Sequence, residues 1–278
     1  QDQGRIVTHD TYSVLETMPM IYPSWGISIL YGLIDKIGGL ELLFIFHRLV
    51  FLLFQYLIYM KIKAAKLTDP KLSLVLLVSV IGASFYCDRP AMIPIIYFVL
   101  INDLIRTLTK KLSPKNLLSF LVIIILWTNT HGSVLFNYIY LLMIAAHDFS
   151  INQFKINKTN YVLLLILIFL GTLVNPFGIE IYPYAIETAM VSKSRLISEW
   201  SSPTLPTKEV FIEVLLFYVT GAYVCYRYFK KLGLKFVFHP VFLTFIFGLS
   251  TFRNIIWFFW TFLVYFKDSP FYKIEDSK

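Results

Sequence analysis

The sequence predicts an all-α, polytopic integral membrane protein built as a helical bundle, and two observations lead to this fold class. Of its 278 residues, 57% are hydrophobic and the mean hydropathy is +0.68, which is more apolar than a soluble domain of this length. The Leu, Ile and Phe residues also recur in blocks of roughly 15 to 20, close to the length that a bilayer crossing requires. The two observations exclude an ordinary soluble domain.

The net charge of +8 does not indicate a nucleic-acid-binding protein. The basic residues form short clusters between apolar blocks, which is how cationic residues flank membrane spans. No nucleic acid is therefore expected as a partner. The two cysteines, Cys87 and Cys225, are predicted on opposite faces of the membrane and are not expected to pair.

The chain is expected to have two parts. Residues 1–39 should form an outer-face segment with a short amphipathic or re-entrant helix over 27–37, which Gly38 and Gly39 end. Residues 40–278 should form the transmembrane domain, with about nine spans. His47 and Arg48 lie inside the first span and should face the bundle and pack against a polar neighbour, because charge is costly in lipid. The spans are predicted over 40–60, 71–86, 91–105, 116–130, 133–146, 161–174, 210–228, 236–249 and 255–266.

The positions of Lys and Arg predict the orientation of these spans. Seventeen of the 25 basic residues lie in alternate loops, as expected of cytoplasmic loops. The chain should therefore start outside and end in the cytoplasm of a multi-pass cell-membrane protein, and an upstream span is implied. The long outer loop 175–208 has room for a substrate-binding structure. The basic loops are 61–71, 106–115, 155–158, 227–235 and 267–278.

A polar stretch from Trp127 to Ser133 interrupts two apolar blocks and is the centre of the predicted site. Unsatisfied polar groups in hydrocarbon cost several kcal/mol each, so this stretch should lie at a membrane surface or line a cavity. Asn129 is expected to cap the helix that starts near Ser133, and Gly132 to allow the sharp turn. For His131, catalysis and simple bonding to the backbone are equally open. Trp127 itself is expected in the interfacial aromatic belt, as are Trp25 and Trp257.

Several short motifs occur in a recognisable order along nearly the whole chain. They are Gly4-Arg5-Ile6, Asp10-Thr11-Tyr12-Ser13, Gly38-Gly39-Leu40, Arg89-Pro90, Leu126-Trp127 with Asn129 and His131-Gly132, Asn175-Pro176-Phe177-Gly178, Glu199-Trp200 and Arg253-Asn254. This order resembles a family of bacterial polytopic membrane proteins similar to glycosyltransferases of the GT-C type. The resemblance implies transfer of a sugar from a polyprenyl-phosphate carrier to an envelope glycan, lipid or protein at the outer face. In similar members an acidic motif precedes the segment that matches Gly4-Arg5-Ile6, upstream of this chain.

Such a reaction needs a base, positive charge or a metal for the leaving phosphate, and a pocket that orients both substrates. Asp10 is the candidate base or metal-linked acid, and an Asx-turn is its structural alternative. His131 is the second catalytic candidate. Arg89 and Arg253 suit phosphate because the guanidinium group is a planar fork, although headgroup contact is also open.

The remaining candidates are predicted to bind substrate. Glu199 beside Trp200 suits a sugar hydroxyl and the apolar face of the ring. The other predicted substrate-binding residues are His9, Asn129 and Asn254. No cofactor is certain. The sequence contains no metal-ligand spacing, and a divalent metal such as Mg or Mn is left open as a possible cofactor. The expected partners are the lipid-linked sugar donor, the acceptor and membrane lipids.

Two other functions remain open at this stage. A transporter or flippase for a lipid-linked or small polar substrate predicts polar residues through the mid-membrane region and symmetry between halves, whereas here the polar turns gather on one face. A non-catalytic membrane subunit is the second alternative. It stays open because the acidic motif found in similar members would lie before Gln1 and is not among these residues.

Overall fold

The structure, a computed structural model, describes residues 21–63, 93–151, 157–194 and 211–266, together with positions 70, 74, 77, 78, 203 and 270. Within these residues all regular structure is helical and no strand occurs, which confirms the all-α prediction. The predicted span over 71–86 and the outer-face segment before residue 21 lie almost wholly outside the described residues.

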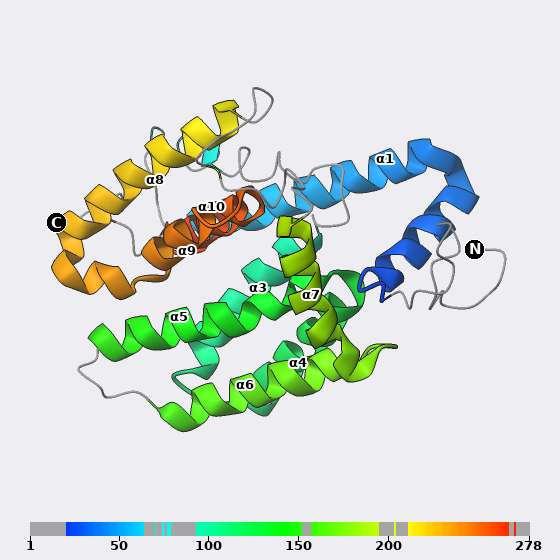
Figure 1. Ribbon diagram of the computed structural model, residues 1–278, viewed down its shortest axis with the longest axis horizontal. Coiled ribbons are helices and arrows are strands. Elements are labelled where there is room, and N and C mark those ends of the chain that lie inside the picture. The colour runs from blue at the N-terminus through cyan, green and yellow to red at the C-terminus, as the bar shows by residue number, and fades with distance from the viewer. Residues whose placement is uncertain are drawn as a thin grey trace. The chain divides into compact units, whose positions relative to one another are not determined.

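The described helices follow most of the predicted apolar blocks (Figure 1). The α-helices are α1 (Trp25–Lys63), α3 (Ile93–Leu108), α4 (Pro114–Thr130), α5 (Phe136–Ile151), α6 (Lys158–Leu173), α7 (Ile181–Ser194), α8 (Phe211–Leu232), α9 (Pro240–Gly248) and α10 (Ile255–Val264). Short 3-10 helices stand at four breaks: η2 (Gly132–Leu135), η3 (Gly178–Glu180), η6 (Gly233–Phe238) and η7 (Phe252–Asn254).

Some of these helices are long and apolar enough to cross a membrane. Among the described residues, the segments Trp25–Met60 and Gly132–Ile151 meet this condition singly. Two bent pairs meet it together: Lys158–Leu173 with Gly178–Thr188, bent by 109°, and Val214–Phe238 with Pro240–Gly248, bent by 78°. Length and composition therefore support two to four crossings in this part of the chain, which is fewer than the predicted nine.

The described residues fall into two compact units, which are treated separately below. The first unit holds those within Gln1–Val50, Tyr86–Tyr138 and Asn157–Val191. The second holds those within Phe51–Phe85, Ile139–Ile156 and Ser192–Lys278.

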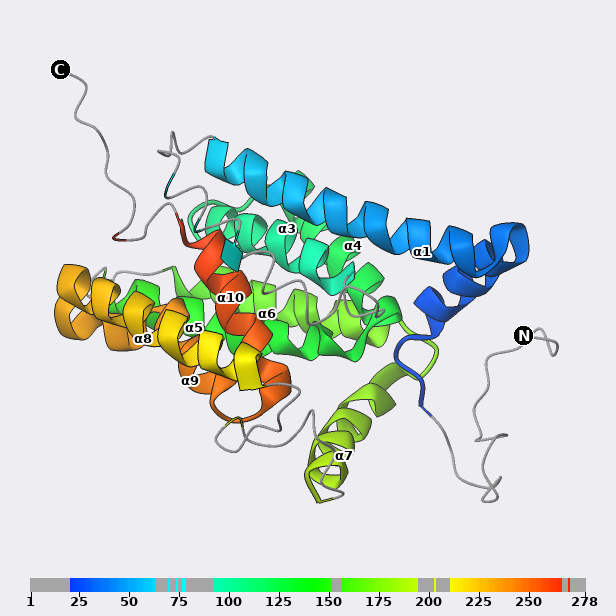
Figure 2. The ribbon, with the colours of Figure 1, turned by 90° about the horizontal axis from the view of Figure 1, so that it is seen from above.

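In the first unit, α4 packs against both α3 and α6 (Figure 2). Gly171 of α6 permits close packing, because a Cβ there would lie 2.6 Å from Ile124 Cγ2 of α4. The buried Asn160 of α6 donates from Nδ2 to the carbonyls of Leu108 and Thr109, both at 3.0 Å. This amide satisfies carbonyls at the end of α3 that the helix itself leaves without partners.

In the second unit, α9 packs against α10, and aromatic side chains fill the contact. All ten residues of α10 are buried. The sequence predicts one span over 236–249, but the chain bends at His239, where the following Pro240 favours an extended residue. His239 is extended (ψ 135°), and its Nδ1 accepts from Val241 N at 3.2 Å, so its buried side chain caps α9.

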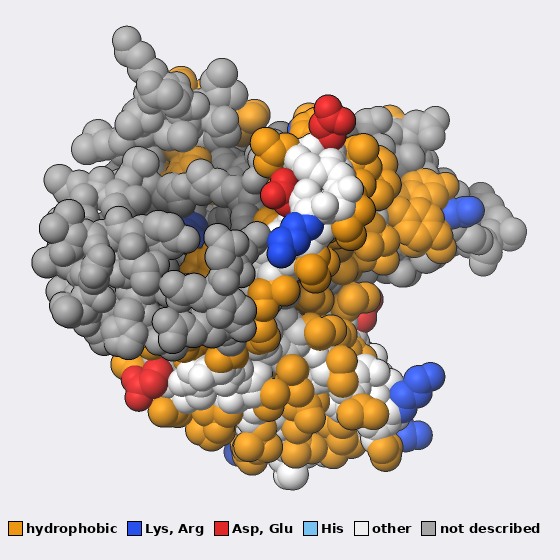
Figure 3. Space-filling view, turned by 90° about the vertical axis from the view of Figure 1, so that its right-hand side faces the viewer, with side chains coloured by type: hydrophobic (Ala, Val, Ile, Leu, Met, Phe, Trp, Pro, Cys, Tyr) orange, Lys and Arg blue, Asp and Glu red, His pale blue; other side chains and the backbone are white. Residues whose placement is uncertain are grey.

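The surface of the described residues is unusually apolar. Figure 3 shows one face, on which hydrophobic side chains cover most of the described surface and charged side chains are few. On α1 the exposed fraction is 80% for Ile37, 76% for Leu40 and 59% for Leu52. Large exposed apolar patches are uncommon on soluble monomers, so this surface fits a lipid environment.

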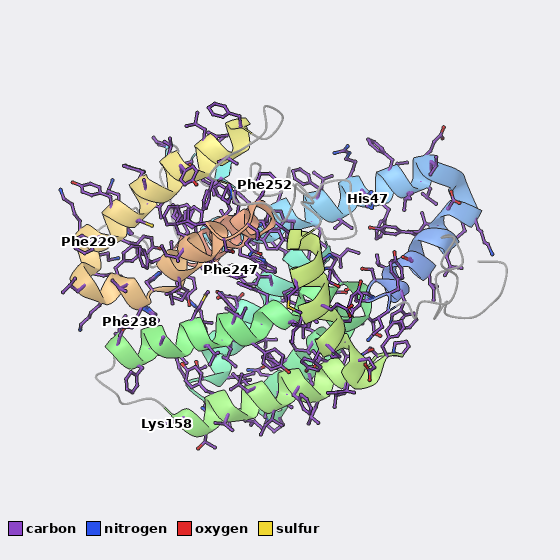
Figure 4. The ribbon with its side chains drawn as sticks, viewed as in Figure 1. His47, Lys158, Phe229, Phe238, Phe247 and Phe252 are labelled. Atoms are coloured by element: carbon purple, nitrogen blue, oxygen red, sulfur yellow. The ribbon has the colours of Figure 1, made fainter. Side chains whose placement is uncertain are left out.

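Helix α1 folds back on itself at the predicted break. Gly39 has a φ of 64° and a ψ of −164°, a conformation that favours glycine. His47 on the second half, labelled in Figure 4, forms a 2.8 Å hydrogen bond between its Nε2 and Tyr31 Oη on the first half. The prediction of a polar neighbour for His47 is confirmed. Arg48 is exposed, and its guanidinium lies over the Phe44 ring, 4.4 Å from the centroid.

Candidate functional site

In the last turn of helix α4, polar side chains donate hydrogen bonds to backbone carbonyls of the same helix. Thr128 Oγ1 donates to Ile124 O at 2.8 Å, and Thr130 Oγ1 donates to Leu126 O at 3.0 Å. His131 then adopts an extended conformation (φ −165°, ψ 136°), which stops the helix. The break is therefore built into the sequence, and it lies at the predicted boundary between two apolar blocks.

Asn129 joins three segments of the first unit. Its Oδ1 accepts from Trp25 Nε1 at 2.9 Å, at the start of α1. Its Nδ2 donates to Ile125 O at 2.8 Å and to Val174 O at 2.7 Å, the latter just beyond α6. Both amide hydrogens are thus donated within the protein, so a substrate could reach only the second lone pair of Oδ1.

The start of α1 approaches the end of α4 closely at Gly26. A Cβ built on Gly26 would lie 2.5 Å from the backbone oxygen of Asn129, which no side chain tolerates. Gly132 is different: it is not among the glycines with positive φ, and a Cβ there would meet Pro23 Cγ at an ordinary 3.4 Å. The prediction that Gly132 is needed for the turn is therefore wrong, because the extended His131 changes the chain direction.

His131, and not Asn129, caps the helix that follows. Its Nδ1 accepts from Ser133 N at 3.0 Å and lies 2.8 Å from Ser133 Oγ. Ser133 Oγ accepts from Trp127 Nε1 at 3.0 Å, so its own hydrogen can point to His131 Nδ1. The prediction that Asn129 caps this helix is wrong. The Asn129 side chain bonds to Trp25, Ile125 and Val174, and the His131 ring bonds to the Ser133 amide instead.

This network fixes the tautomer of His131. Because Nδ1 accepts a backbone N–H, the hydrogen of a neutral imidazole lies on Nε2. His131 in this form is a hydrogen-bond donor through Nε2, and its Nδ1 is already in use. The arrangement suits a ligand oxygen, such as a phosphate or sugar oxygen, better than proton abstraction from an acceptor.

Trp25, Trp127, Asn129, His131 and Ser133 together are called the break cluster below. Trp127 is 0% exposed, so the expectation that it lies in an interfacial belt is wrong, as it is for the buried Trp257 of α10. The cluster contains donors and acceptors but no carboxylate. Its Trp and Asn donors bond to partners inside the protein, so a ligand oxygen would be bound through His131 Nε2.

A second network of polar side chains lies in the same unit and includes Tyr182 of the predicted outer loop. Tyr138 Oη and Tyr182 Oη are 2.7 Å apart, and Tyr182 Oη also contacts Thr172 Oγ1. Thr172 Oγ1 donates to Phe169 O at 2.8 Å, which orients the chain of hydroxyls from Tyr138 to Tyr182 to Thr172. These contacts join α5, α6 and α7.

The turn after α6 is organised by Asn175. Its Oδ1 accepts from Phe177 N at 2.7 Å, and its Nδ2 donates to Thr172 O and to Gly178 O. The predicted loop 175–208 consequently contains η3 and the fourteen-residue helix α7 over much of its length. Helix α6 ends at Leu173, directly before Asn175-Pro176-Phe177-Gly178, as the Pro and Gly of this motif indicate.

Arg253 and Asn254 belong to the second unit, where both lie in η7. Asn254 Nδ2 donates to Ser250 Oγ at 3.0 Å, and the Arg253 side chain is partly exposed. The structure brings this pair together and, separately, brings Asn129 together with His131. His9, Asp10, Arg89, Glu199 and Trp200 lie outside the described residues, so their predicted roles stay predictions.

No group of three or more His, Cys, Asp or Glu within the described ranges could hold a metal ion. The break cluster, which lacks carboxylates, does not fit Mg or Mn, since these ions prefer oxygen ligands with charge. A metal site would need the acidic residues outside the described part of the chain.

Sequence reasoning missed Trp25, Ser133, Tyr138 and Tyr182 as members of these polar networks. For Trp25 a signal was present: the adjacent Gly26 marks a close backbone approach. Ser133 stands two residues after a histidine at a helix break, which is the spacing of a side-chain cap. The two tyrosines are far apart in sequence, and no local pattern pairs them.

Comparisons of the chain with protein-family models, with curated proteins and with solved structures found no match. The likeness to GT-C glycosyltransferases therefore depends on the residues and motifs of the sequence itself.

Proposed function

We propose that this chain is the membrane-embedded part of a GT-C-like glycosyltransferase, which moves a sugar from a polyprenyl-phosphate carrier to an envelope glycan, lipid or protein. In this proposal the protein is a multi-pass cell-membrane protein whose active side is outside. The break cluster is the observation that carries the proposal. Hydrogen-bonded polar side chains that interrupt apolar helices are costly in a membrane, and such groups mark functional sites by default.

The proposed roles follow from chemistry and from the contacts above. His131 donates from Nε2 to an oxygen of the phosphate or the sugar, and Asn129 positions it by joining α1, α4 and the end of α6. Asp10 is the proposed base, and Arg89 with Arg253 would hold the phosphate. The remaining proposed contacts to sugar or acceptor come from His9, Glu199, Trp200 and Asn254.

A second candidate is a transporter or flippase for a lipid-linked substrate. The two bent helix pairs favour it, because discontinuous helices form the binding sites of many transporters. Transport requires movement of the substrate without a new glycosidic bond. The two candidates can therefore be separated by the product.

The test is transfer of radiolabelled sugar from a panel of polyprenyl-phosphate sugars by membranes that contain the full-length protein. Asp10→Asn and Arg89→Ala should abolish transfer, whereas Asn157→Ala, at an exposed helix start without a side-chain cap, should leave it unchanged. EDTA shows whether a divalent metal is needed. Carrier movement across the bilayer without transfer from any donor would overturn the proposal in favour of transport.

Two further substitutions test the proposed role of His131 itself. The amide nitrogen of glutamine can take the place of Nε2, whereas asparagine can take the place of Nδ1 and keep the bond to Ser133 N. If Nε2 donates to substrate, His131→Gln should keep more activity than His131→Asn. The reverse order, in proteins equally well inserted, would leave His131 only its capping role.

A further inference from the structure

The 3-10 helix η3 and helix α7, which follows it directly, expose an apolar stripe along one side. The exposed fraction is 52% for Ile179, 62% for Ile186 and 63% for Met190, and the exposed Pro183 lies between them. Spacings of seven and four residues place these side chains on one face of a helix. On the other side, Ile181 is 1% exposed. The helix is thus one-sided, and its apolar side has no cover from the described residues.

The direction of α7 is set by the turn before it. The segment Gly178–Thr188 is bent by 109° from α6, and Figure 2 shows α7 running away from α3, α4 and α6. Asn175 shapes this turn, and Tyr182 ties the first turn of α7 to Tyr138 and Thr172. The bend is therefore maintained by specific hydrogen bonds on both sides of it.

Helix α6 carries an exposed apolar stripe of its own, which leads to this bend. Val162, Ile166, Leu170 and Val174 are between 48% and 54% exposed and recur every fourth residue. Lys158, labelled in Figure 4, marks the other end of α6. Helix α6 has sixteen residues and meets the length condition for a crossing only together with Gly178–Thr188, but its stripe and basic start suit insertion with the stripe toward the acyl chains.

We propose that η3 and α7 together form an interfacial helix, which lies in the plane of the membrane with Ile179, Ile186 and Met190 inserted among the lipids at the outer surface. If α6 crosses the bilayer, the 109° bend turns α7 close to the membrane plane. Its apolar stripe then continues the lipid-facing stripe of α6, and the exposed Glu180 and Glu187 lie along its polar edge. One-sided helices of this kind sit at a depth of about 5–10 Å at the headgroup boundary.

The proposal names lipid, and not a protein partner, as what covers the stripe. The reason is that exposed apolar residues occur on both sides of the bend, in α6 and again over residues 179–190, and lipid is one apolar medium that can cover both. The inference rests on the membrane insertion contained in the proposed function, but it does not depend on sugar transfer.

Spin labels can measure this depth in the full chain reconstituted in phosphatidylcholine nanodiscs. In a Cys87→Ser, Cys225→Ser background, single cysteines would replace Ile179, Ile186 and Met190, with Ile166 and Glu187 as references. Accessibility to oxygen and to a water-soluble nickel complex reports how deep each label lies. All five positions are exposed, so labels there should not disturb packing.

The expected result is one shallow depth shared by the three α7 labels, a deeper Ile166 label and an aqueous Glu187 label. A stripe accessible to nickel, beside a lipid-accessible Ile166, would overturn the interfacial helix while leaving membrane insertion intact. Depth that increases from residue 179 to 190 would make α7 re-entrant, and shielding from both reagents would mean a protein cover; either overturns the proposal. An Ile166 label outside lipid would overturn the membrane placement itself.

Discussion

Two helix breaks of this protein are built alike but are stabilised in different ways. In the first unit a 3-10 turn separates α4 from α5, and in the second a 3-10 turn separates α9 from α10. The first break is tied by side-chain hydrogen bonds from α1, α4 and η2, centred on Asn129 and His131. At the second, Thr251 and Asn254 make no side-chain cap, and the adjoining α10 is buried along its whole length.

The difference between the two breaks suggests that the polar groups of the first break do more than stabilise the fold. At the second break the packing is largely apolar, because the rings of Phe217 on α8, Phe245 on α9 and Phe258 on α10 have centroids 5.1 to 5.6 Å apart. The polar network around Asn129 is therefore not needed merely to turn the chain. Polar groups retained where apolar ones would serve are candidates for binding.

The largest effect is expected for Asn129→Ala. Loss of this amide leaves Trp25 Nε1 and Val174 O without their partner and should lower the free energy of unfolding in detergent micelles by about 2–4 kcal/mol. Asn157→Ala is the matched control, because Asn157 is exposed and makes no side-chain cap; its effect should stay below about 0.5 kcal/mol. Equal effects of the two substitutions would contradict the importance of the Asn129 contacts.

The outcome for Asn129 illustrates what the sequence could and could not predict. The break near residue 131 and the helices on both sides were predictable, because a run of polar residues between apolar blocks is a local signal. The partners of Asn129 were not, since Trp25 and Val174 are 104 and 45 residues away. The cap by His131 was missed because histidine is an unusual capping residue.

The helix α7 was missed for a similar reason. Pro176 and Gly178 indicated the end of a helix, and the residues after them were predicted to form a long outer loop over 175–208. Proline is tolerated in the first turn of a helix, however, because the N–H groups there have no intrahelical acceptor. Pro183 is the third residue of α7. The bend between His239 and Pro240 was likewise hidden inside an apolar block that suggested one continuous span.

Gly26→Ala should be the next most damaging change. The new Cβ would collide with the backbone oxygen of Asn129, and a backbone atom cannot move as a flexible side chain can. We expect a loss of about 1–3 kcal/mol of unfolding free energy, despite the higher helix propensity of alanine. Gly132→Ala, with ordinary space around its Cβ, is the control and should change stability by less than about 0.5 kcal/mol. A damaging Gly132→Ala with a tolerated Gly26→Ala would reverse this interpretation of the α1 contact.

Serine substitutions compare the two breaks directly. Ser133→Ala removes the acceptor of the buried Trp127 and one contact of His131, so we expect a loss of about 1–2 kcal/mol. Ser250→Ala removes contacts to Phe247 O and Asn254 at an exposed position and should cost less than about 0.5 kcal/mol. Chemical unfolding of both variants under the same micelle conditions checks the difference. Similar losses would mean that the second break also depends on its polar side chains.

The smallest effect is expected inside α10, where Thr261 is fully buried and its Oγ1 has no hydrogen-bond partner among the described residues. Thr261→Val exchanges an unsatisfied hydroxyl for a methyl group of the same shape, and should leave stability unchanged or raise it by up to about 1 kcal/mol. Thr244→Val in α9 is the matched substitution, because Thr244 Oγ1 donates to Pro240 O at 2.7 Å; that variant should lose about 1 kcal/mol. A loss for Thr244→Val without a loss for Thr261→Val would show that a buried hydroxyl contributes to this core only where it has a hydrogen-bond acceptor. A loss in both variants would mean that the Thr261 hydroxyl has a partner of its own, such as a buried water, and that the two units differ less than the comparison of their breaks implies.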